Sequence, residues 1–280
     1  MKIGVRYINK GFYSSMENAE ALAAGAEACG LESLWTAEHV VLPSKISSRY
    51  PYSSDGSFPD SHESSIPDSL VWLTWLGAKT RHVLLGTGVL VLPHRNPVVL
   101  AKQIATLDRL TRGRVLLGIG VGWLREEFDA VGTPFDRRGS VTDEYMQAMR
   151  KLWTEPEASF SGNAVNFDGV SCEPKPFRGT VPIVVAGHSA AAARRAGRFG
   201  DGWFPTPASR LQDLGEIMRQ EARACGRDPS EIEITIGCPD PRDVDYFRAL
   251  GAHRVLFPAP TVAPERIERE LQTLLRSVAL

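Results

Sequence analysis

The chain has 280 residues, of which 43% are hydrophobic and 23% charged, and its formal net charge is −1. This composition is typical of a globular protein and excludes a strongly basic surface for nucleic acid or an acidic membrane. The four cysteines stand far apart without a CxxC pair, and no apolar run is long enough to span a membrane. We therefore expect free thiols and a cytoplasmic protein.

Strand-like and helix-like segments alternate along the whole chain. Short apolar runs predict strands at 2–8, 33–41, 82–92, 114–122, 181–187, 202–207, 231–238 and 253–260. Apolar residues at helical spacing predict helices at 17–29, 68–79, 97–112, 141–153, 190–199, 211–225, 242–249 and 264–275. This repeat indicates a single (β/α)8 barrel domain over residues 1–280, and the alternative is an open doubly wound sheet.

The segment from Gly86 to Trp123 carries the clearest signals. It predicts a buried strand, a helix and a second buried strand, with Asn96 as the helix cap and Pro97 at the first helical position. Buried strands joined through a helix are parallel. Glycines gather where each strand ends, at Gly86, Gly88, Gly118, Gly120 and Gly122. Because glycine weakens a strand, we interpret these clusters as places where a flat group approaches the backbone.

Two insertions interrupt the repeat, after the second and the fourth predicted strands. Residues 43–66 are rich in Ser, Pro, Asp and Tyr, which is compatible with a lid over a substrate or with plain disorder. Residues 155–177 contain two short alternating runs around Gly162 and Asn163, which predict a β-hairpin covering the barrel helices.

The active site of a (β/α)8 barrel lies at the carboxyl ends of its strands. The candidate site residues that the pattern places there are Glu38, His39, Gly88, Val89, Gly120, Gly122, Trp123, Ala186, Gly187, His188 and Ser189. His39 is the strongest candidate for proton transfer, because imidazole titrates near neutral pH. Adjacent strand residues face opposite sides, so only one of Glu38 and His39 would face the barrel interior.

The stretch 186–189 stands at the start of a predicted helix, where backbone N–H groups and the helix dipole attract phosphate. Ordinary capping by Ser189 explains the same residues equally well. The GIGVG run at 118–122 lacks the spacing of a dinucleotide-binding motif.

A metal-dependent hydrolase is the main competing class of enzyme. Its His, Asp or Glu ligands would converge at the strand ends, but the first predicted strand ends without a histidine and the six histidines are scattered. No G-x-S-x-G elbow supports a serine hydrolase either. We therefore expect no catalytic metal. A separate residue, Arg138 in the stretch PFDRRG, is interpreted as a structural residue that forms an ion pair.

Five stretches of the sequence are distinctive: SLWTAEHVVLP, YPYSSDGSFP, LGTGVLVLPHRNPVVLAKQIATLDRLTRGRVLLGIGVGWLREEFDAVGTPFDRRG, LWTEPEASFSG and AGHSAAAARRAGRFGDGWFPTP. Together they resemble the bacterial luciferase-like superfamily, and in particular its F420-dependent oxidoreductases. The resemblance is strong over residues 1–207.

This resemblance implies a barrel that binds the deazaflavin F420, or alternatively FMN, at its C-terminal face and commonly dimerises through the early helices. It implies a non-proline cis peptide at Gly88–Val89 behind the ring, with Gly120 and Gly122 flanking the ring. The cofactor's phosphate-bearing tail would lie at 186–189.

The resemblance also assigns a catalytic position. His39, with Glu38 beside it, would lie next to the reactive ring edge and serve as the base in hydride transfer to F420. In an FMN-dependent monooxygenase the same histidine would support flavin peroxide chemistry. Trp123 stands where relatives place a carboxylate, so we expect it to stack on the ring or form a wall. A non-catalytic cofactor-binding protein is the remaining alternative, and the small-molecule substrate is not identified.

Overall fold

The computed structural model describes residues 1–205 and 210–278. Its centre is a closed barrel of eight parallel strands, which follow one another as β1 Lys2–Arg6, β2 Ser33–Thr36, β3 Leu84–Thr87, β5 Val115–Gly120, β8 Ile183–Ala186, β9 Gly202–Phe204, β10 Glu233–Gly237 and β11 Arg254–Pro258. β11 pairs with β1 and closes the ring. The predicted (β/α)8 barrel is confirmed, and the open sheet is wrong.

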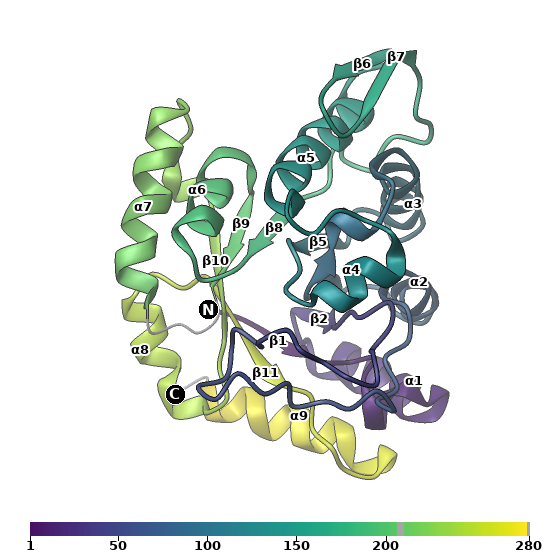
Figure 1. Cartoon of the computed structure of the whole chain (residues 1–280). Coiled ribbons are helices and arrows are strands. Elements are labelled where there is room, and N and C mark those ends of the chain that lie inside the picture. Colours follow the sequence, from purple (N-terminus) through teal and green to yellow (C-terminus); the bar gives the residue numbers. More distant parts are fainter. Residues whose placement is uncertain (206–209, 279–280) are drawn as a thin grey trace.

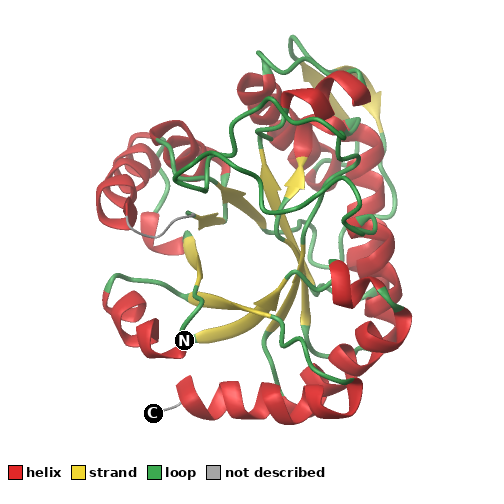
Figure 2. Ribbon diagram, turned by 60° about the horizontal axis from the view of Figure 1, so that its bottom comes forward, coloured by secondary structure: helices red, strands yellow, loops and turns green. Residues whose placement is uncertain are grey.

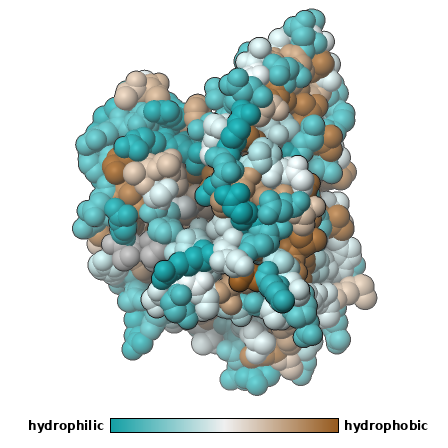
Figure 3. Space-filling model, in the orientation of Figure 1, coloured by the Kyte–Doolittle hydropathy of each residue, from teal (hydrophilic) through white to brown (hydrophobic). Residues whose placement is uncertain are grey.

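Helices surround the strands (Figures 1 and 2). They are α1 Met16–Cys29, α2 Ser69–Lys79, α3 Pro97–Leu110, α4 Arg125–Val131, α5 Arg138–Thr154, α6 Ala190–Phe199, α7 Leu211–Ala224, α8 Val244–Ala249 and α9 Pro264–Val278. Short 3-10 turns cover Gly11–Ser14, Leu92–His94, Pro229–Glu231 and Pro241–Asp243. The surface is largely hydrophilic over α6 and α7, and apolar patches lie toward α2 and α3 (Figure 3).

The predicted end signals of α1 and α3 are confirmed. The Asn96 side chain accepts hydrogen bonds from the N–H groups of Val98 and Val99 at 3.0 and 3.2 Å, and Pro97 is the first residue of α3. Gly30 follows α1 with a φ of 69°, the left-handed conformation that glycine adopts without strain.

The second strand ends earlier than its predicted end at residue 41. The Asn9 side chain donates to the Ala37 carbonyl at 2.9 Å and accepts from the Ala37 N–H at 2.7 Å, so it takes the place of a neighbouring strand. Glu38 and His39 therefore lie in a loop pinned to the end of β1. The expected alternation of these two side chains is wrong, because it holds only within a strand.

The third predicted strand is interrupted. β3 is followed by a cis peptide at Gly88–Val89 and by the short β4, Leu90–Val91. The helix α4 is an element that the sequence pattern did not predict. β9 ends at Phe204, and residues 206–207 of the predicted strand lie outside the described residues.

The predicted hairpin is present. β6 Ala158–Ser161 pairs antiparallel with β7 Asn166–Val170, and β6 contacts α5. Lys102 of α3 donates to the Glu173 carbonyl at the end of the insertion, which joins this segment to the helices outside the barrel.

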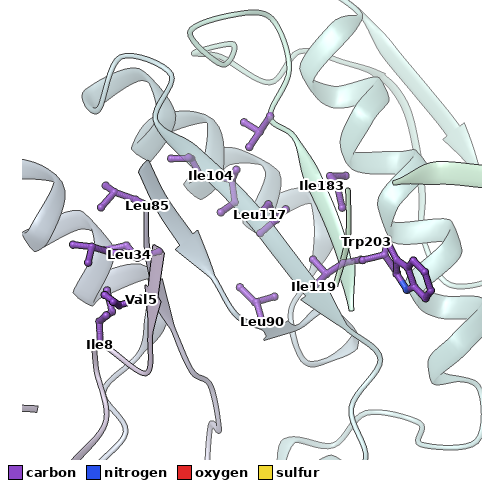
Figure 4. Close-up of a cluster of buried hydrophobic side chains, with 14 of the residues drawn as sticks. Val5, Ile8, Leu34, Leu85, Leu90, Ile104, Leu117, Ile119, Ile183 and Trp203 are labelled. Atoms are coloured by element: carbon purple, nitrogen blue, oxygen red, sulfur yellow. The ribbon is translucent and has the colours of Figure 1, made fainter. Parts of the chain in front are cut away.

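Side chains of the strands alternate between two apolar layers. Leu34, Leu117 and Ile183 belong to the outer layer, where Ile104 of α3 packs beside Leu117 (Figure 4). This layer joins the barrel to its helices, and its residues are the ones that the unbroken apolar runs predict.

The inner layer is built around the fully buried Trp35, which packs with Leu116, Val184, Phe204 and Leu256. A Cβ on Gly86 would lie 2.4 Å from the indole, and one on Gly118 would lie 3.2 Å from it. The flat group that approaches Gly86 and Gly118 is therefore the Trp35 side chain. The interpretation of these two glycines as ligand-contact positions is wrong.

Replacing Gly118 by alanine is expected to destabilise the barrel by about 3 kcal/mol, because overpacked cores must shift backbone or rotamers. The new Cβ would lie 1.8 Å from the Thr87 carbonyl oxygen, which cannot move without disturbing β3. Urea unfolding measures this loss. Gly215→Ala is the matched control, since its Cβ would meet only the flexible end of Arg219, at 3.3 Å. Equal stability of the two variants would contradict the packing argument.

Glu27 ties α1 to the segment before β3. Its carboxylate accepts from the N–H groups of Arg81, His82 and Val83 at 2.8, 2.8 and 2.9 Å. Burial acts to raise the pKa of Glu27, but these hydrogen bonds outweigh it and lower the pKa to about 2.

The folded-state pKa of Glu27 lies below the unfolded value, so the charged carboxylate stabilises the fold above the unfolded pKa and loses this effect as the pH falls. Glu27→Gln is therefore expected to cost about 1–2 kcal/mol at neutral pH. The difference from wild type should close as the pH falls from 4.5, the ordinary pKa of a glutamate, to about 2. Unfolding curves over this range check the prediction, and a pH-independent difference would contradict it.

Candidate active site

A cavity of about 840 Å³ opens at the carboxyl ends of the barrel strands. It is lined by every candidate site residue from the sequence: Glu38, His39, Gly88, Val89, Gly120, Gly122, Trp123, Ala186, Gly187, His188 and Ser189. The loop 43–66, dark blue in Figure 1, adds Tyr50, Tyr52 and Phe58 to the lining. This loop thus lies over the cavity, where a lid would have to be.

Aromatic rings surround His39. Its imidazole lies 5.2 Å from the Phe58 ring and 6.1 Å from the Trp123 ring, between centroids. Tyr50 and Phe58 approach Trp123 to 5.0 and 5.1 Å. Trp123 is therefore part of an apolar wall that keeps water from one side of the imidazole.

His39 is held by Glu127, a buried residue of α4. The Glu127 carboxylate lies 2.9 Å from Nδ1 of His39 and also accepts from the Val40 N–H at 2.5 Å. A carboxylate can only accept, so Nδ1 of a neutral imidazole carries the hydrogen. The lone pair is then on Nε2, which is the arrangement that a general base requires.

The preceding residue, Glu126, holds the loop above. Its carboxylate accepts from the N–H groups of Ser47 and Ser48 at 2.6 and 3.0 Å and from the Ser48 hydroxyl at 2.6 Å. Burial opposes these hydrogen bonds, which nevertheless lower the pKa of Glu126 to about 2. One turn of α4 therefore fixes both the loop and the histidine.

Glu38 is turned toward an arginine. Its carboxylate pairs with Arg95 at 2.5 Å and accepts from the Val91 N–H at 2.6 Å, and Arg95 also pairs with Asp68 at 2.8 Å. Burial raises the pKa of Glu38, and the Arg95 charge opposes this shift. Since its oxygens are already bonded to protein groups, Glu38 is placed to hold the end of β2 beside β4 and α2.

Small residues form another wall of the cavity. The Gly88–Val89 peptide is cis, as the resemblance implied. A Cβ on Gly120 would lie 2.9 Å from the Val89 side chain, and one on Gly122 would lie 2.5 Å from the Phe128 ring. Gly122 also has a φ of 81°, so neither space nor backbone admits a larger residue there.

The start of α6 borders the same cavity. Ser189 accepts from the Ala192 N–H at 3.1 Å, so it does cap the helix, and the stretch 186–189 lines the cavity. The positive end of the helix dipole therefore acts on this side of the pocket.

Arg138 adds a positive charge to the cavity lining. It donates to the carbonyls of Gly122 and Phe135 at 3.1 and 3.0 Å, and its guanidinium lies 3.8 Å from the Phe135 ring. Within residues 1–205 and 210–278 no carboxylate forms an ion pair with it. The expected ion pair is wrong, and burial lowers the pKa of Arg138.

The sequence pattern missed Glu127, Arg95 and Arg138 as site residues. A signal for Glu127 was present: the stretch LREEF has apolar residues four apart around an acidic pair, which is typical of a short helix with a charged first turn. No local sequence pattern indicated a role for Arg95, because its partners Glu38 and Asp68 are distant in sequence.

Among the described residues, no group of three or more His, Cys, Asp or Glu side chains is arranged to hold a metal ion. The helices in the described part of the chain are all too short or too polar to cross a lipid bilayer.

Residues 4–239 match the family model of the luciferase-like monooxygenases. The chain belongs to this family. It is 35% identical over 246 residues to an uncharacterized protein of Mycobacterium tuberculosis, with 86% of each chain covered. It is 33% identical to an F420-dependent glucose-6-phosphate dehydrogenase of Kineococcus radiotolerans, over 87% of this chain and 69% of the relative.

Two solved structures share the whole fold of this chain. One is the monooxygenase RslO1 of Streptomyces bottropensis, with a TM-score of 0.79, 21% identity and all of both chains covered. The other is an F420-dependent secondary alcohol dehydrogenase in complex with an F420–acetone adduct, with a TM-score of 0.79 and 18% identity, covering 99% of this chain and 98% of that one. These two structures show the fold, whereas the family match and the dehydrogenase relative show that the chain is an oxidoreductase.

Proposed function

We propose that this luciferase-like protein binds F420 and transfers a hydride between the deazaflavin and a small organic substrate. The observation that carries the proposal is the pairing of His39 with Glu127 beside a cavity whose lining also includes the start of α6 and Arg138. His39 suits proton transfer, and the start of α6 with Arg138 suits an anionic tail. Relatives that use F420 support the choice of cofactor.

The residues of the cavity fit such a cofactor. The small residues Gly88, Val89 and Gly120 would lie against a flat ring, and the stretch 186–189 with Arg138 would bind a phosphate-bearing tail. F420 supplies a two-electron carrier that exchanges a hydride with carbon.

His39 supplies proton transfer. When a substrate alcohol is oxidised, the hydrogen on the carbon that bears the hydroxyl would leave as a hydride to the bound deazaflavin, and Nε2 of His39 takes the O–H proton. In the opposite direction, the protonated imidazole returns that proton to a carbonyl oxygen. Glu127 acts as a positioning residue that fixes the tautomer. The rings of Tyr50, Phe58 and Trp123 exclude water from the transfer.

An FMN-dependent monooxygenase is the second candidate, since RslO1 matches the fold as closely as the F420-dependent alcohol dehydrogenase does. Titration of the cofactor-free protein with each cofactor separately, followed by quenching of tryptophan fluorescence, tests the choice. We expect saturable binding of F420, with FMN at least about tenfold weaker. Binding of FMN without a response to F420 would reverse the assignment, and no binding of either would contradict both.

We also propose that the protein acts as a cytoplasmic homodimer through its early helices. Supporting this, Val71 of α2 and Leu110 of α3 are 71% and 70% exposed. Apolar patches gather on the side of the molecule where α2 and α3 lie (Figure 3). Light scattering after gel filtration measures the assembly. Leu110→Glu is expected to yield monomers, and an unchanged mass would contradict this interface.

A further inference from the structure

The cavity has a second basic wall, across the barrel from α6. In the ring of eight strands β1 and β8 are separated by β2, β3 and β5 on one side and by β11, β10 and β9 on the other, so they lie opposite each other. Arg6 is the last residue of β1 and lines the cavity. A cofactor whose tail lies at α6 therefore leaves Arg6 on the side available to the substrate.

The Arg6 guanidinium is held in place but not neutralised. Its Nε is buried and has no hydrogen-bond partner, and within the described residues no carboxylate forms an ion pair with it. Its central carbon lies 4.8 Å from the Tyr7 ring centroid. A Cβ on Gly237 of β10 would lie 2.5 Å from Nη1, so glycine at that position makes room for the guanidinium.

The carboxylates that line the cavity already have other partners. Asp60 pairs with Lys10 at 2.6 Å, Glu38 pairs with Arg95 at 2.5 Å, and Glu127 lies 2.9 Å from Nδ1 of His39. An unpaired, buried guanidinium N–H costs free energy until an acceptor binds to it. The Arg6 side chain is therefore expected to favour binding of an anion.

Three tyrosines line the cavity together with Arg6, and the Tyr52 ring also lies 5.1 Å from His188 on the α6 side. Tyr50 and Tyr52 have ring centroids 5.2 Å apart, and in the described part of the chain the hydroxyls of Tyr7, Tyr50 and Tyr52 donate to no protein acceptor. Tyr7 has a φ of 67°, a conformation rare outside glycine, which turns the chain at the end of β1.

The phenols of Tyr50 and Tyr52 stay protonated at neutral pH and can donate. Burial raises the pKa of Tyr50 to about 12, with the nearby Tyr7 and Tyr52 adding to the shift and Arg6 opposing it. Burial and Tyr7 also raise the pKa of Tyr52. Arg6, Tyr7, Tyr50 and Tyr52 all line the same cavity.

We propose that Arg6, with the hydroxyls of Tyr7, Tyr50 and Tyr52, forms a subsite for an anionic group of the substrate, a carboxylate or a phosphate. That the anion belongs to a substrate rests on the proposed function. Guanidinium and phenol donors around one oxyanion supply charge-assisted hydrogen bonds. The substrate class is then a small organic acid or phosphate ester whose oxidisable carbon reaches His39.

Calorimetric titration of the cofactor-free protein with inorganic phosphate and with succinate tests the subsite. The background variant Arg138→Gln removes the competing anion site at α6. In this background, Arg6→Gln is expected to weaken binding of at least one of the two anions by about 10- to 100-fold. The anion that loses more affinity identifies the substrate group as phosphate or carboxylate.

Two further variants make the test specific. Gly237→Ala keeps the charge but displaces the guanidinium, so it is expected to weaken the same anion. Arg276→Gln removes an equal charge from the exposed end of α9 and is expected to change nothing. Unaltered affinity in both Arg6→Gln and Gly237→Ala, equal weakening by Arg276→Gln, or no anion binding in the background protein would each overturn the proposal.

F420 titration of Arg6→Gln separates this inference from the proposed function. Wild-type affinity for F420 is expected. Loss of F420 binding in this variant alone would overturn the substrate subsite. Failure of the wild-type protein to bind F420, with Arg6-dependent anion binding intact, would contradict the proposed function and leave the subsite standing.

Discussion

Replacing His39 by alanine is expected to lower kcat by about 10²- to 10⁴-fold, the usual contribution of a positioned general base. The Glu127 carboxylate lies 2.9 Å from Nδ1 of His39, so the proton must be transferred at Nε2. Alanine at position 39 has no atom that can accept this proton. The rate is measured as F420 reduction with the alcohol or sugar phosphate that the wild-type protein oxidises fastest.

The same variant has a built-in control. His39 is not among the residues that would bind the cofactor tail, so the affinity for F420 should stay within about twofold of wild type. Added imidazole is expected to restore part of the lost rate, because it can occupy the vacated space between Phe58 and Trp123. An unchanged kcat would remove the acid–base assignment and favour a non-catalytic cofactor-binding protein.

Glu127→Gln separates positioning from catalysis. The amide can still accept from Nδ1 but must also place an NH2 group near the Val40 and Val41 N–H groups, which the carboxylate satisfies at 2.5 and 3.4 Å. We therefore expect a fall in kcat smaller than that of His39→Ala, with little change in KM.

Replacing Arg95 by alanine is expected to destabilise the fold by about 3–5 kcal/mol, since it leaves a buried charge without its partner. Glu38 would keep only the Val91 N–H at 2.6 Å, in surroundings that raise its pKa. A buried carboxyl is less costly when protonated, so the loss of stability should grow as the pH rises and shrink toward acid pH.

The double variant Arg95→Ala with Glu38→Gln tests this explanation. A neutral amide can accept from Val91 without carrying a charge into the protein. The double variant should therefore be more stable than Arg95→Ala alone at neutral pH, as urea unfolding would measure. A double variant that is less stable than either single variant would contradict the account of Glu38 as a buried, paired charge.

Local signals predicted the fold and a set of candidate site residues that line one cavity. The barrel follows from a repeat of apolar strands and amphipathic helices, and the cap at Asn96 is encoded within four residues. The candidate residues line one cavity because the strand ends of a closed parallel barrel meet on one face.

Long-range contacts limited the prediction. β2 ends at Thr36 because the Asn9 side chain replaces a strand partner, and no local pattern around residue 36 encodes that contact. Glu127 lies 88 residues from His39 in sequence, so their hydrogen bond could be found only in three dimensions. The glycines of β3 and β5 were visible as a cluster, but the Trp35 indole that they accommodate comes from another strand.

The most direct test of the central claim is a crystal structure of the protein soaked with F420. We expect the deazaflavin ring against Gly88–Val89 and Gly120, with its reactive edge toward Nε2 of His39 and its phosphate at residues 186–189 beside Arg138. A ring bound outside this cavity, or a phosphate held by Arg6 on the opposite wall, would contradict it.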